Sequence, residues 1–127
     1  IRQAIEVRSA TFADPVFIEL LKTYNVALVI ADTADWPYVD QTADFTYCRL
    51  QGAPGKERYT PADLDAWAKR FRALSAGKPI DGKTIVPTAA RPPQRDVFAY
   101  FVSTDKPNAP VNALGIQQRL NITPATD

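Results

Sequence analysis

Charged and polar side chains gather at the ends of three apolar segments of this sequence. Glu6 and Arg8 stand in the segment IEVR, Asp32 ends the run VALVIAD, and Arg49 and Gln51 lie in the second half of DFTYCRLQG. Guanidinium groups bind phosphate and carboxylate through paired hydrogen bonds, and a carboxylate beside them can accept a proton. If the three segment ends meet, these residues predict an anion-binding pocket with Glu6 and Asp32 as candidate catalytic carboxylates.

The same charges have a structural interpretation that the sequence leaves equally open. Buried ionic side chains pair with one another, so these charges, Glu6, Arg8, Asp32 and Arg49, are also able to form an ion-pair network that holds no ligand. Two classes of function therefore stay open. One is an enzyme, or former enzyme, that acts on an anionic small molecule or a phosphodiester, and the other is a non-catalytic binding or scaffold protein.

Two tyrosines complete the candidate ligand-binding set. Tyr59 follows the loop GAPGKE, which lacks the first glycine and the final Ser or Thr of a phosphate-binding P-loop. This loop leaves the same segment end as Arg49, so we expect Lys56, Arg58 and Tyr59 to fold over an anionic ligand. Tyr100 lies in the segment DVFAYFVS and is expected to share a face with Arg49.

Composition makes several classes of function less favoured. The net charge of +1 makes a dedicated nucleic-acid binder less favoured without excluding one, and no apolar run approaches the roughly 20 residues that span a bilayer. The chain has no histidine, so no metal site is assigned and the cofactor stays unknown. The single cysteine, Cys48, is predicted to be a buried apolar residue, which favours a reducing, cytoplasmic compartment.

Hydrophobic periodicity predicts the elements that position these residues, in the order β-α-β-loop-β-α-β-α. Strands are predicted over 5–8, 26–32, 44–52 and 96–103, and helices over 15–24, 61–76 and 110–120. Asp14 and Thr60 are the predicted N-caps of the first two helices. The buried stripe of the second helix is predicted to be Leu64, Trp67, Ala68, Phe71 and Leu74.

Alternation of strands and helices predicts parallel strands. Half of an eightfold α/β barrel and a small open, doubly wound α/β sheet both fit this order. An open sheet packs helices on both faces, where a row containing Glu6, Tyr47 and Arg49 is hard to place, whereas a barrel interior accommodates such residues at its carboxyl end. The barrel is therefore favoured.

The segment from Lys78 to Arg95 is long, basic and rich in proline. It joins a helix to the next strand, which places it on the barrel face opposite the site. We predict a solvated insertion that is dispensable for folding and activity.

Several motifs together resemble the domain of unknown function 72 family, also called YecE-like. These motifs are IEVRS before a helix, LLKTYNVALVIADT, TADFTYCRLQG followed by Tyr59 and LDAWAKR, and DVFAYF followed by NAP and NAL. The resemblance implies a TIM-like (β/α)8 barrel of which this chain, as one partial domain over residues 1–127, is the C-terminal half. The family pattern has histidines where this chain has Ser9 and Gln51, which indicates a divergent branch.

The resemblance also implies that the N-terminal half is absent from this chain. The lack of any methionine agrees with a piece of a longer protein. Half of a barrel leaves two sheet edges open, and open edges favour pairing with other strands. We therefore expect either a missing N-terminal half or self-association, in which a second copy supplies the missing wall.

Overall fold

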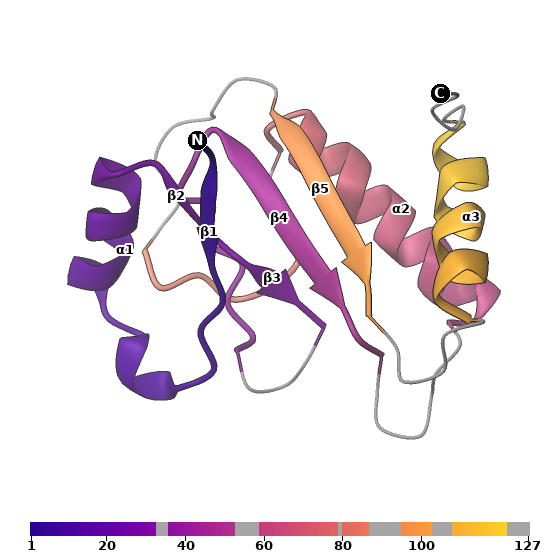
Figure 1. Ribbon diagram of the computed structural model, residues 1–127. Helices are drawn as coiled ribbons and strands as arrows, with labels where there is room; N and C mark the ends of the chain where they lie inside the picture. Colours follow the sequence, from indigo (N-terminus) through magenta and orange to yellow (C-terminus); the bar gives the residue numbers. More distant parts are fainter. Residues whose placement is uncertain (33–35, 53–58, 79, 87–94, 103–107, 122–127) are drawn as a thin grey trace.

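The computed structural model in Figure 1 describes residues 1–127 except 33–35, 53–58, 79, 87–94, 103–107 and 122–127. Its elements follow the predicted order. They are β1 (Gln3–Ile5), a 3-10 helix (Ala10–Phe12), α1 (Pro15–Thr23), β2 (Val26–Leu28), β3 (Ile30–Ala31), β4 (Phe45–Leu50), α2 (Pro61–Ser75), β5 (Asp96–Phe101) and α3 (Asn108–Leu120).

The strand ladders in the described residues are all parallel, as predicted. β1 pairs with β2, and β3, β4 and β5 form a second ladder in that order. The run that was predicted as one strand over 26–32 is thus two strands separated by Val29. Its first part pairs with β1 and its second part with β4, so a single stretch of chain changes partners as the sheet curves.

The first strand also differs from its predicted bounds of 5–8. β1 ends at Ile5, whose carbonyl still accepts a hydrogen bond from the N–H of Val29 at 2.9 Å. Val7 then turns into the apolar cluster beneath α1 and is buried. The predicted alternation nevertheless holds, because Glu6 points away from that cluster and borders a cavity on the other face.

Both predicted N-caps are confirmed. The Asp14 carboxylate accepts from the N–H of Val16 at 2.8 Å, and Thr60 forms a reciprocal capping box with Asp63. The predicted buried stripe of α2 is confirmed in full. The buried face of α1 consists of Ile18 and Leu21, whereas Leu20 and, just after the helix, Tyr24 are exposed.

The helices lie on one face of the strands. α2 and α3 pack over Ile30, Cys48 and Leu50, while α1 packs over Leu28. Figure 1 shows α2 behind β4 and β5, with α3 beside it. The opposite face, called the inner face below, carries Phe45, Tyr47 and Arg49 of β4 together with Glu6. A doubly wound sheet would place helices on both faces, which the described elements do not do.

The described part of the connection between β3 and β4 contains no helix. It lies beside residues 80–86, where Tyr38 and Lys83 form a parallel bridge and the N–H of Val39 donates to the carbonyl of Lys83 at 2.8 Å. Trp36 is buried in the α1 cluster, against which Ile85 and Val86 also pack. The prediction of a solvated insertion is therefore wrong for Ile80, Ile85 and Val86, which pack partly buried against the two apolar clusters, whereas residues 81–84 are exposed as predicted.

Cys48 is a fully buried member of the larger apolar cluster, as predicted. Burial raises the pKa of its thiol to about 12. The thiolate is the nucleophilic and metal-binding form of cysteine, so Cys48 acts as a packing residue at neutral pH.

Candidate functional site

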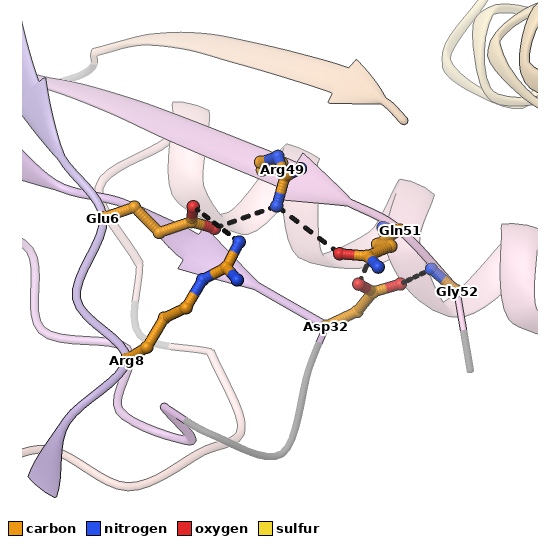
Figure 2. A network of polar contacts seen from close by, with 6 residues as sticks. All are labelled: Glu6, Arg8, Asp32, Arg49, Gln51 and Gly52. Carbon is orange, nitrogen blue, oxygen red and sulfur yellow. Dashed lines mark hydrogen bonds and ion pairs between the residues drawn. The ribbon is translucent and has the colours of Figure 1, made fainter. Parts of the chain in front are cut away.

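Two arginines converge on one carboxylate at the carboxyl end of the inner face. Arg49 Nη1 lies 3.4 Å from Glu6 Oε1, and Arg8 Nη2 lies 3.5 Å from Glu6 Oε2. Figure 2 shows Glu6 between the two guanidinium groups. The side chains of Glu6 and Arg49 are 27% and 28% exposed, and that of Arg8 is 64% exposed. The three side chains together carry one positive charge in excess.

Gln51 extends this network along β4. Its side-chain oxygen accepts from Arg49 Nη1 at 3.4 Å, so the guanidinium lies between a carboxylate and an amide. A cavity of about 380 Å³ opens beside Arg49 and Glu6, with Tyr47, Phe45, Val29, Ala4 and Arg2 as its other lining residues. The predicted meeting of the strand ends is therefore observed for Glu6, Arg8, Arg49 and Gln51.

Asp32 lies next to this network but uses its oxygens differently. Its carboxylate accepts from the backbone N–H groups of Gln51 and Gly52, each at 2.8 Å. The phenol of Tyr59 donates a third hydrogen bond to the same carboxylate. Asp32 thus fixes the point where the chain leaves β4, next to Gly52, whose φ of 84° lies in the left-handed region that favours glycine.

Tyr59 is held by this bond and by its ring, which packs edge-on against Phe101 with the centroids 5.4 Å apart. Burial, together with the hydrogen bond to the Asp32 carboxylate and its charge, raises the pKa of Tyr59 above its usual value. The phenol therefore donates to Asp32 at neutral pH. Lys56 and Arg58, predicted to close over a ligand with Tyr59, lie outside the described residues.

Tyr100 stands opposite Arg49 in the register of β4 and β5. Its ring stacks on that of Tyr47, with the centroids 5.2 Å apart and the planes at 21°. Tyr100 is 53% exposed, so the stacked pair is open on the inner face. The structure thus brings Tyr100 beside the charged network, as predicted, and adds Tyr47 as its partner.

One residue of the inner face was missed. Arg2 forms an ion pair with Asp96 at 3.0 Å and lies over the rings of Phe45 and Phe98, at 5.3 and 5.4 Å from their centroids. Arg2 and Glu6 lie an even number of residues apart, so strand alternation extended back from Glu6 would have found it. Its reach from β1 to β5 indicates a strongly curved inner face.

Three further observations concern metal binding, a second cavity and the helices. Among the described residues, no group of three or more His, Cys, Asp or Glu side chains is arranged to hold a metal ion. A larger cavity of about 650 Å³ lies between α2, α3 and the outer face of β5, and none of the predicted site residues lines it. None of the helices in the described ranges is long and apolar enough to cross a membrane.

Comparison with known proteins points to one family. A family model described as "Protein of unknown function DUF72" matches residues 1–126. The comparison with curated proteins finds no match. Two crystal structures of a DUF72 family protein from Enterococcus faecalis V583 are similar to this chain, with TM-scores of 0.67 and 0.70 at 20% and 19% identity.

These alignments cover 97% and 98% of this chain but 50% and 49% of the E. faecalis chains. This chain therefore spans about half the length of the solved relative. At this level of identity the likeness concerns the fold.

Proposed function

Since this chain belongs to the DUF72 family, whose function is unknown, we propose a function from the site itself. The protein binds a small anionic or phosphate-containing ligand at the carboxyl end of its inner face. In this proposal the parallel strands form half of a TIM-like barrel in the complete protein, and the ligand lies at the mouth of that barrel. The one-sided helix layer and the curved inner face support this arrangement.

The observation that carries the proposal is the position of Arg49. Its guanidinium lies at a cavity, is partly exposed, and shares the single Glu6 carboxylate with Arg8. Two guanidinium groups on one carboxylate retain donors and positive charge for a second anion. Asp32 adds a negative charge nearby, but its oxygens already accept from two backbone N–H groups and a phenol. The positive charge that remains for a ligand is therefore carried by Arg8 and Arg49.

The residues then divide into three roles. Arg8 and Arg49 hold the anion, and Gln51 orients Arg49 through its side-chain oxygen. Glu6 is the candidate proton acceptor, because its carboxylate borders the cavity. Asp32 is a positioning residue in this proposal, since it holds the end of β4 and Tyr59 rather than facing the cavity.

A second candidate is a binding or scaffold protein that keeps the barrel without chemistry. The family pattern that this chain resembles has histidine after the arginine, and this chain has Ser9 at that position. Its hydroxyl accepts from the N–H of Thr11 at 3.3 Å and so caps the 3-10 helix. Ser9 therefore has a structural role. Among the described residues that line the cavity, Glu6 is the one carboxylate, and it pairs with both Arg8 and Arg49.

A paired screen separates the two candidates. The full-length protein is tested for binding and for turnover against a panel of phosphate esters, carboxylates and short phosphodiesters. The proposed function predicts that some member binds, with saturation and a raised melting temperature. An enzyme predicts turnover that is lost in Glu6→Gln and kept in the control Glu19→Gln, an exposed carboxylate of α1. Binding without turnover supports the scaffold, and no binding by any member of the panel contradicts the proposal.

A further inference from the structure

We propose that the stacked pair Tyr47 and Tyr100 forms a ring-binding subsite beside Arg49. The ligand of the inner face is then a phosphate ester of an aromatic ring, of the size of a nucleoside monophosphate. This inference rests on the proposed anion site, because it takes Arg49 as the group that holds the phosphate. It adds the chemical class of the rest of the ligand.

The first support is the geometry of the pair. The two rings are nearly parallel, at 21°, with centroids 5.2 Å apart, so each ring covers one face of the other and a further ring would stack on the outer face of Tyr47, which borders the cavity. Bases and other planar rings stack on such surfaces, and each base stacked on an aromatic side chain contributes about 1–3 kcal/mol. Tyr100 and Arg49 are opposite each other in the register of β5 and β4, which places the stack and the cation on neighbouring strands of the same face.

The second support is a contrast between the two ends of the inner face. At the amino end, Phe45 and Phe98 meet edge to face, and the guanidinium of Arg2 covers both rings. At the carboxyl end, no guanidinium in the described ranges lies over Tyr47 or Tyr100. One aromatic pair is thus closed by the protein's own cation, and the other is left open next to the excess positive charge of Arg8 and Arg49.

The third support is space. The cavity of about 380 Å³ borders both Tyr47 and Arg49, so one small ligand can contact the stack and the guanidinium together. Small-molecule pockets in proteins usually measure about 300–1,000 Å³, which places this cavity at the small end of the range. A single nucleotide fits this scale. An oligonucleotide would require a longer groove.

Titration calorimetry on the full-length protein tests the subsite with three probes: inorganic phosphate, ribose 5-phosphate and adenosine 5′-monophosphate. We expect adenosine monophosphate to bind at least about fivefold more tightly than ribose 5-phosphate, because only the former carries a ring that stacks. Tyr47→Leu should remove this difference and leave the Kd of ribose 5-phosphate unchanged. Tyr47→Phe should keep the difference, since it retains the ring, and Tyr24→Leu, at the exposed C-cap of α1, serves as the matched control.

The outcomes separate this inference from the function on which it rests. Equal affinity for ribose 5-phosphate and adenosine monophosphate would overturn the ring subsite and leave the anion site standing. A difference that persists in Tyr47→Leu would overturn it as well. Absence of binding by all three probes would overturn the anion site and the subsite together. Binding of single-stranded oligonucleotides without binding of adenosine monophosphate would replace the mononucleotide by a nucleic acid.

Discussion

The guanidinium of Arg49 lies 3.4 Å from the carboxylate of Glu6, although the two residues are 43 positions apart in the chain. Arg49 belongs to β4 and Glu6 follows β1, and the run containing β2 and β3 lies between them in the strand order. The two side chains therefore reach across one intervening strand on the inner face. The ion pair joins β4 to the residues that follow β1.

Asp32→Asn should destabilise the protein. The Asp32 carboxylate accepts backbone N–H bonds on both oxygens, and an asparagine would turn a donor toward one of those N–H groups. A hydrogen bond to a charged group contributes about 1.5–3 kcal/mol, and this carboxylate is partly buried, so the free energy of unfolding in urea should fall by at most about that amount. Asp65→Asn is the control, because its exposed pair with Arg119 is worth less than about 1 kcal/mol. Equal effects in both variants would contradict the positioning role of Asp32.

Tyr59 should make stability sensitive to alkaline pH. Its pKa in the folded protein is raised by burial and by Asp32, so the protonated phenol stabilises the fold below the usual tyrosine pKa of about 10. This stabilisation is lost as the pH rises above about 10 toward the folded-state pKa. The free energy of unfolding of Tyr59→Phe should therefore fall less steeply than that of the parent between about pH 9 and 11. In the parent, the fall should begin at about pH 10. The exposed control Tyr24→Phe should keep the parent slope, and identical slopes for all three proteins would refute the assignment.

The segment 80–86 should be needed for stability, contrary to what its composition predicts. The buried Asp40 carboxylate accepts from the N–H groups of Ile85 and Val86 at distances of 2.9–3.1 Å. Asp40→Asn should lower the free energy of unfolding by about 1–3 kcal/mol, whereas Asp81→Asn, at an exposed position of the same segment, should change it by less than about 0.5 kcal/mol. A neutral Asp40→Asn would restore the view of a dispensable insertion.

Local signals explain which parts of the fold the sequence predicts. The cap at Thr60 and the apolar repeat from Leu64 to Leu74 are contained in one segment, so α2 is predicted to within one residue. The alternation that places Tyr47 and Arg49 on one face of β4 is equally local. These features depend on neighbours in the chain and need no knowledge of tertiary partners.

The parts that sequence reasoning misses depend on distant residues. The break at Val29 arises because β2 and β3 pair with different strands. The packing of Ile80, Ile85 and Val86 depends on partners outside their segment, namely Asp40 and the two apolar clusters. The stack of Tyr47 on Tyr100 depends on the register between two strands. Such features become visible only when the strands are assembled.

The measurement that tests the anion site most directly is the affinity of the full-length protein for inorganic phosphate or its best phosphate ester, compared with that of Arg49→Ala. Loss of a charge-assisted contact costs about 1.5–3 kcal/mol, so the Kd should rise by roughly 10-fold to 100-fold. The melting temperature should change by less than about 3 °C, because a partly exposed ion pair contributes little to stability. Arg70→Ala, which removes an arginine from the outer helix α2, should leave the Kd unchanged. A large fall in melting temperature with an unchanged Kd would show that Arg49 serves a structural ion pair, and would contradict the account.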